Sequence, residues 1–171
     1  MSYLVVSSLA DLHATVAAHD AADVVTLINA DTVVERPSTI APERHLFLGM
    51  NDIAAPAEGL THPAEHHLDR LLEFGRRWDR DKPLAVHCWA GISRSTAAAY
   101  ILAIAINPHL DEEALAQELR RRAPSATPNP LLVSMADEKL GRGGRMVSAI
   151  AAIGRGADAF SGTPFILPLT L

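Results

Sequence analysis

HCWAGISRS, residues 87–95, decides how this 171-residue chain is interpreted. It places the only cysteine, Cys88, six positions before an arginine, Arg94. The apolar run PLAVH at 83–87 predicts a buried strand before the loop, and the alanine-rich segment 93–106 predicts a buried helix after it. A cysteine at such a junction lies beside a helix N-terminus, where the helix dipole and unpaired amides favour an anion. The stretch therefore predicts a strand–loop–helix unit that holds a reactive thiolate.

The residue types in this loop are those needed for attack on a phosphorus atom. The thiolate is the nucleophilic form of cysteine, and once formed it needs no general base. Arg94 offers a planar fork for two phosphate oxygens, and Gly91 allows a tight curl that turns backbone N–H groups inward as an anion nest. We expect Ser95 to donate a hydrogen bond to the Cys88 sulfur, and His87 to order the loop through the backbone. The expected phosphate-binding residues are Trp89, Ala90, Gly91, Ile92, Ser93 and Arg94.

A phosphate ester also needs a proton for its leaving oxygen, and Asp52 is the candidate donor. It ends the stretch LGMND at 48–52, where a predicted strand gives way to an irregular loop. Asp52 lies 36 residues before Cys88, enough for one crossover helix and a returning strand. The alternative role for Asp52 is a turn or helix-cap carboxylate.

The rest of the chain alternates predicted strands and helices. Strands are expected at 3–7, 23–30, 45–50 and 83–87, and helices at 8–19, 63–80, 93–106, 111–122, 130–140 and 146–155. The apolar tail from residue 157 contains two prolines and is expected to pack as an extended cap. The alternation predicts one α/β domain over residues 1–171, with a central, mostly parallel sheet of four to five strands flanked by helices.

Composition and charge narrow the classes of function. The formal net charge of −5 argues against a nucleic-acid partner, which needs a basic footprint, and against an acidic membrane surface. Residues 1–20 lack the basic region of a signal peptide, and no apolar run reaches the roughly 18 residues that span a bilayer. A lone cysteine cannot form an internal disulfide, which fits a reducing compartment. We expect a soluble, cytoplasmic protein that binds neither nucleic acid nor membrane.

HCxxGxSRS with an aspartate upstream resembles the cysteine-based protein-tyrosine phosphatases, specifically their small dual-specificity-like branch. The likeness covers about residues 45–140. LGMND resembles the strand and general-acid loop of that family, and SRSTAAAYILAI at 93–104 resembles the helix after its phosphate loop. The segment 122–130 resembles its downstream Arg/Pro–Asn segment. The resemblance implies a phosphotyrosine-phosphatase-like fold and phosphomonoester hydrolysis through a phosphocysteine intermediate, by a protein tyrosine phosphatase or a dual-specificity phosphatase.

The same resemblance implies roles for individual residues. Cys88 is the nucleophile, Arg94 binds the phosphoryl group and Asp52 is the general acid and base, with no metal or organic cofactor. The implied substrate is a phosphorylated protein or a small aryl phosphomonoester, and the pocket should accept phosphate, sulfate or vanadate. The loop has no lysine, unlike the basic loops of inositol-lipid phosphatases, and this favours a singly phosphorylated substrate.

Two other functions stay open on the sequence. A rhodanese-like sulfurtransferase also uses a cysteine loop ahead of a helix, but sulfur transfer needs no general acid. A non-catalytic phosphate-binding module keeps the fold and typically lacks the cysteine, the arginine or the acid. Candidates for all three groups are present in this chain, which favours the phosphatase.

Three other clusters have simpler interpretations. His62 and His66 are four residues apart, but Pro63 makes His62 a lead-in residue, so a solvated surface is favoured over a metal site. The three arginines at 120–122 are expected to complement the dipole at a helix C-terminus. The two glycines at 143–144 lack a preceding strand and a lysine, and they predict a turn.

Overall fold

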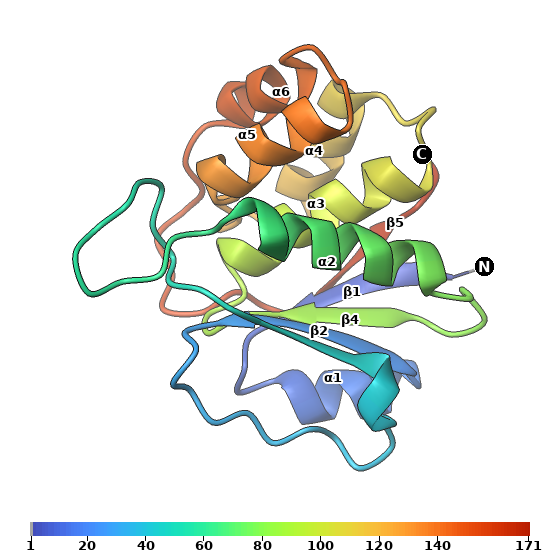
Figure 1. Ribbon diagram of the computed structural model, residues 1–171. Helices are drawn as coiled ribbons and strands as arrows, with labels where there is room; N and C mark the ends of the chain where they lie inside the picture. Colours follow the sequence, from blue (N-terminus) through green and yellow to red (C-terminus); the bar gives the residue numbers. More distant parts are fainter. Residues whose placement is uncertain (1) are drawn as a thin grey trace.

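The computed structural model describes residues 2–171 as a five-stranded sheet between layers of helices (Figure 1). The strands are β1 (Tyr3–Ser7), β2 (Asp23–Ile28), β3 (His45–Gly49), β4 (Leu84–His87) and β5 (Phe165–Pro168). The helices are α1 (Leu12–His19), α2 (Glu65–Arg77), α3 (Arg94–Ile106), α4 (Glu112–Arg122), α5 (Pro130–Lys139) and α6 (Arg145–Ile153), with a short 3-10 helix η1 (Pro42–Arg44) before β3.

The sheet has the strand order β3-β2-β4-β1-β5. The first four strands in this order are parallel to their neighbours, whereas β5 pairs antiparallel with β1. The predicted α/β architecture with a mostly parallel sheet is therefore confirmed, and the sheet is mixed. The tail predicted as an extended cap supplies the edge strand β5, because the buried side chains of Phe165 and Leu167 complete the core beside β1.

Helices cover both faces of the sheet, and this explains the uninterrupted apolar runs in its central strands. On one face, Leu12 and Val16 of α1 pack with Val5 and Val24 of the sheet. On the other face α3 is the central element, and its side chains are buried from its first residue through Ile104. A helix enclosed in this way has no polar stripe, as its alanine-rich sequence predicts.

Two helices begin later than the sequence pattern predicts. The expected helix at 8–19 begins at Leu12. The Ser8 hydroxyl accepts a hydrogen bond from the Asp11 N–H and donates one to the Asp11 carboxylate, so residues 8–11 form a turn before the helix. The expected helix at 63–80 spans only Glu65–Arg77. The His67 side chain stabilises its first turn, because Nδ1 accepts a hydrogen bond from the Ala64 N–H. Pro63 therefore precedes the helix and is not its first residue.

The parallel strands end together at one edge of the sheet, the left-hand side of Figure 1. Residues that follow β1, β2, β3 and β4 meet there although they are far apart in the sequence. In open α/β sheets this carboxyl edge is where ligands bind. The loop containing Cys88 follows β4 at this edge.

Candidate active site

The cysteine loop, residues 88–94, wraps around the Cys88 sulfur ahead of α3. Cys88 is buried, with 2% of its surface exposed. Its Sγ lies 3.1 Å from the Ser95 hydroxyl and accepts the Gly91 N–H at 3.3 Å. Ser95 is in the first turn of α3, so the sulfur lies at the positive end of the helix dipole. A backbone donor, a hydroxyl group and a helix N-terminus therefore converge on the sulfur, and groups of this kind favour a thiolate.

Gly91 fits the loop for two separate reasons. Its φ is +70°, a left-handed conformation that other residues adopt only with strain. A Cβ at this position would also lie 2.8 Å from the backbone of Ser7 and Ser8, at the end of β1. The curl inferred from the sequence is therefore present, and it lies directly against the neighbouring strand.

Arg94 makes hydrogen bonds through one of its nitrogens, Nη1, while another, Nε, has no partner among the described residues. Its Nη1 donates to the Asn29 side-chain oxygen at 2.8 Å and to the Met50 carbonyl at 2.7 Å. Its Nε is buried without a hydrogen-bond partner among the described residues. Leaving a buried charged donor unpaired is costly, so this geometry favours an acceptor such as a phosphoryl oxygen.

No motif in the sequence indicates a role for Asn29. The one feature that could have indicated its role is its position: it is a polar residue directly after the buried strand β2, and β2 lies next to β4, the strand that leads to Cys88. Asn29 and Arg94 are 65 residues apart, and only the strand order brings them together.

Asp52 lies on the loop after β3, and two neutral side chains orient it. Its Oδ1 accepts from the Ser93 hydroxyl at 2.7 Å and from the Asn129 amide nitrogen at 2.9 Å. The oxygen of Asn129 caps α5 by accepting the N–H groups of Leu131 and Leu132. Asn129 is 2% exposed, so it links the start of α5 rigidly to the acid. Neither Ser93 nor Asn129 was predicted to position Asp52.

His87 stabilises the cysteine loop through a chain of hydrogen bonds that continues to Thr26 and His45. Its Nδ1 donates to the Cys88 carbonyl at 3.0 Å, since a carbonyl can only accept. Its Nε2 therefore accepts from the Thr26 hydroxyl at 2.7 Å, and Thr26 in turn accepts from His45 at 2.8 Å. Burial lowers the pKa of His87 to about 4, although the bond to the Cys88 carbonyl opposes this. The ring is neutral at physiological pH, with one tautomer fixed by its partners.

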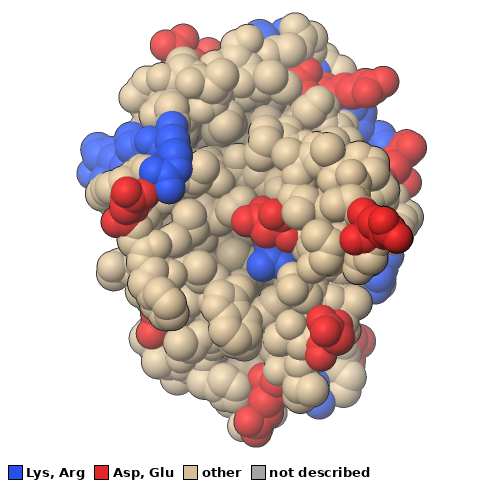
Figure 2. All heavy atoms as spheres, turned by 90° about the vertical axis from the view of Figure 1, so that its left-hand side faces the viewer, with Lys and Arg blue, Asp and Glu red and all other residues tan. Residues whose placement is uncertain are grey.

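These groups surround an open cavity of about 560 Å³ at the carboxyl edge of the sheet. Figure 2 shows this face, where a blue group and red groups lie together at a central hollow among mostly uncharged residues. The cavity is lined by Ile28, Asn29, Thr32, Asp52, Cys88, Trp89, Ala90, Ile92, Ser93, Arg94, Ala159 and Phe160. The structure thus brings Asp52, Cys88 and Arg94 to one cavity. Ala159 and Phe160 of the C-terminal segment also line it, although no sequence pattern predicts this.

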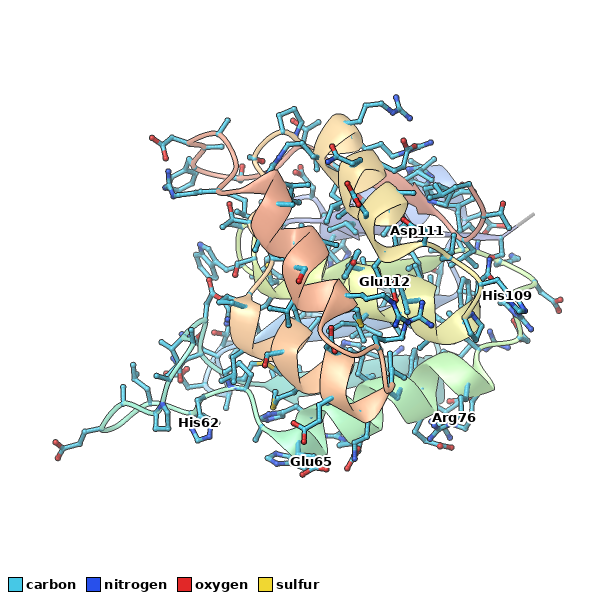
Figure 3. The ribbon with its side chains drawn as sticks, turned by 90° about the horizontal axis from the view of Figure 1, so that it is seen from above. His62, Glu65, Arg76, His109, Asp111 and Glu112 are labelled. Carbon is cyan, nitrogen blue, oxygen red and sulfur yellow. The ribbon has the colours of Figure 1, made fainter. Side chains whose placement is uncertain are left out.

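The three other residue clusters noted in the sequence, near His62, at 120–122 and at 143–144, each have a structural explanation. His62 lies on the loop ahead of α2 (Figure 3), and residues 2–171 contain no group of three or more metal-ligating side chains. Arg120 donates to backbone carbonyls of the loop after α4 and of the end of α6, including those of Pro124 and Gly154. The glycine pair forms a turn, and Gly144 is the N-cap of α6. A second cavity of about 550 Å³ lies between η1 and α2. Cys88 does not line it.

No family model matches this chain, and no curated protein sequence matches it. Solved structures do match. The PTP-2 phosphatase of Cydia pomonella superposes with a TM-score of 0.63 and 22% identity, over 80% of this chain and 85% of that one. Human DUSP28 gives 0.59 and 19%, over 79% and 86%. The chain has the dual-specificity phosphatase fold.

A third neighbour has a ligand in its structure. PTPMT1, solved in complex with PI(5)P, superposes with a TM-score of 0.61 and 15% identity, over 88% of this chain and 93% of that one. The fold implied by HCxxGxSRS is confirmed by these neighbours. In residues 2–171 no helix is long and apolar enough to cross a membrane.

Proposed function

We propose that this protein hydrolyses phosphomonoesters through a phosphocysteine intermediate, as a tyrosine or dual-specificity phosphatase. The observation that carries the proposal is the arrangement of three groups around one cavity. Cys88 offers a sulfur that contacts the Gly91 N–H and the Ser95 hydroxyl. Arg94 offers an unpaired buried Nε, and Asp52 offers an oriented carboxyl group. The fold shared with known phosphatases is in keeping with this chemistry.

The first step of the proposed reaction transfers the phosphoryl group to the enzyme. The Cys88 thiolate attacks phosphorus and forms an S–P bond while the bond from phosphorus to the leaving oxygen breaks. Protonated Asp52 gives its proton to that oxygen, so an alcohol or a phenol departs. Arg94 and the backbone N–H groups of the cysteine loop offset the charge on the non-bridging oxygens.

The second step releases phosphate. The Asp52 carboxylate, now ionised, takes a proton from water as the water oxygen attacks phosphorus. The S–P bond breaks and the electron pair returns to sulfur, where the Ser95 hydroxyl at 3.1 Å stabilises the departing thiolate. Inorganic phosphate is the product, and the enzyme returns to its starting protonation state.

Hydrolysis of p-nitrophenyl phosphate between about pH 5 and 8 tests the proposal, because general acid and base groups act in this range. We expect turnover by the wild type, none by Cys88→Ser, and competitive inhibition by vanadate. Asp52→Asn should retain phosphate binding and lose most turnover.

Two results would contradict the proposed function. A folded wild type that binds vanadate without any turnover would identify a phosphate-binding module. Conversion of thiosulfate and cyanide to thiocyanate, with no phosphate ester hydrolysed, would identify a sulfurtransferase.

A further inference from the structure

Two aromatic side chains are exposed at the cavity that contains Cys88. Trp89 is 58% exposed and Phe160 is 95% exposed. Both line this cavity, and the other Phe, Tyr and Trp side chains of residues 2–171 are buried or half-buried. Exposed aromatic surface at a cavity is typical of a binding site, because the ring gains from burial against a ligand.

The segment that carries Phe160 is fixed at both ends. On one side, Gly156 donates its N–H to the Thr127 hydroxyl at 3.0 Å. On the other, Gly162 donates its N–H to the Ala90 carbonyl of the cysteine loop at 2.7 Å. Both glycines are buried, and the residues between them are exposed. Phe160 therefore lies on a short bridge anchored to the loop that binds the phosphoryl group.

The contact between this bridge and the loop is very close. A Cβ on Gly162 would lie 2.8 Å from the Gly91 carbonyl oxygen, so only a glycine allows the two backbones to approach in this way. Packed backbone thus fixes the segment at Gly162, two residues after Phe160. A ligand that contacts Phe160 gains binding free energy without the entropic cost of ordering a mobile tail.

The charges of the cavity limit the ligand further. Its lining contains one cation, Arg94, and one acid, Asp52. A single phosphoryl group uses the cation, and no second cation in the lining is available for another phosphate. The remaining lining is uncharged: aromatic and apolar side chains, among them Trp89 and Phe160, lie beside polar ones such as Asn29 and Thr32.

We propose that Phe160, together with Trp89, forms an aromatic wall that makes this site selective for aryl phosphate esters. The inference rests on the proposed function, since it assigns a substrate class to the same site. The phosphoryl group binds Arg94 and the loop amides while the aromatic ring of the ester packs against Phe160. Alkyl esters and inositol phosphates lack the ring and gain less from this wall.

Ligand binding tests the wall without requiring turnover. Calorimetry would compare phenylphosphonate with inorganic phosphate in the wild type, Phe160→Ala, Phe160→Leu and Phe160→Tyr. We expect Phe160→Ala to weaken phenylphosphonate binding about 3- to 10-fold, the range for an aromatic pair, and to leave phosphate binding unchanged. Phe160→Leu should recover part of the affinity and Phe160→Tyr most of it.

Val147→Ala is the matched control, because Val147 is an exposed apolar residue of α6 that does not line the cavity. Equal loss for both ligands in Phe160→Ala, or no loss for either, would overturn the aromatic wall. An inactive wild type that still shows the selective loss would overturn only the proposed catalysis.

Competition assays then distinguish the source of the ring. A phosphotyrosine peptide that competes better than phenyl phosphate would assign the ring to a protein substrate. Equal competition would assign it to a small free ester. Stronger competition by an inositol monophosphate than by phenyl phosphate would overturn the proposal.

Discussion

Protonation of His87 should destabilise the protein in mild acid. The folded state holds this ring neutral between the Thr26 hydroxyl and the Cys88 carbonyl, and burial lowers its pKa from the ordinary 6.5 to about 4. In the unfolded chain the ring takes up a proton near pH 6.5. Between these two values the unfolded state binds more protons than the folded state. Stability is therefore complete above pH 6.5 and falls as the pH drops towards 4.

The size of the effect follows from the same two values. A difference from 6.5 to about 4 corresponds to about 3 kcal/mol of unfolding free energy, with a slope of up to ~1.4 kcal/mol per pH unit. This is a large fraction of the 5–15 kcal/mol that stabilises domains in general, taken as an order of magnitude. Burial also lowers the pKa of His45 and of His67, so their contributions have the same sign.

Urea unfolding of the wild type and of His87→Gln, from about pH 7.5 to 4.5, isolates the contribution of His87. The other titratable groups are present in both proteins, so their effects cancel in the difference, except for that of His45, which shares the Thr26 hydroxyl with His87. The wild type should lose about 2 to 3 kcal/mol more than the variant across this range. Identical pH slopes in the two proteins would refute the reasoning, because the buried ring would then titrate as it does in the unfolded chain.

Two further predictions concern the loop and the acid. Gly91→Ala should cost about 1–3 kcal/mol in urea unfolding and reduce turnover, whereas Gly59→Ala, with φ +73° but open space around its Cβ, should cost less. Equal costs would mean that the contact with β1 contributes nothing. Asn129→Asp keeps an acceptor for the cap of α5 but removes the donor to Asp52, so kcat should fall about 10- to 100-fold. Its thermal midpoint should also fall, because the variant buries a second carboxylate beside Asp52 and loses the bond to the Ile53 carbonyl. KM should change little, and an unchanged kcat would exclude Asn129 as a positioning residue for Asp52.

The parts of the site that lie close together in the sequence were predictable. Residues 87–95 contain the strand end, the curl and the helix start, so the contact between Cys88 and Ser95 follows from local geometry. The fold class was equally accessible, because apolar runs alternate with amphipathic or alanine-rich segments. Both inferences depend on interactions within a few residues.

The parts that depend on strand order were not predictable from one sequence. Asn29 contacts Arg94 because β2 and β4 are neighbours in the sheet, and no pattern around Asn29 indicates this. Phe160 reaches the cavity because β5 returns to β1, and the two prolines of the tail obscured that strand. The start of α2 depends on one side-chain hydrogen bond from Ala64 to His67, which propensity does not detect.

The pairing of β5 with β1 also has a consequence for synthesis on the ribosome. β1 is the first strand of the domain to be made, and in the sheet its register with β5 joins Tyr3 to Pro168. Closing so long a loop is slow and costs chain entropy, so we expect the β1–β5 pair to form late in folding. A nascent chain released before residue 160 would lack both the final strand and the ring beside Cys88. The edge strand β5 and the aromatic ring at the entrance to the cavity are therefore supplied by one segment that is synthesised after the residues that hold Cys88 and Arg94.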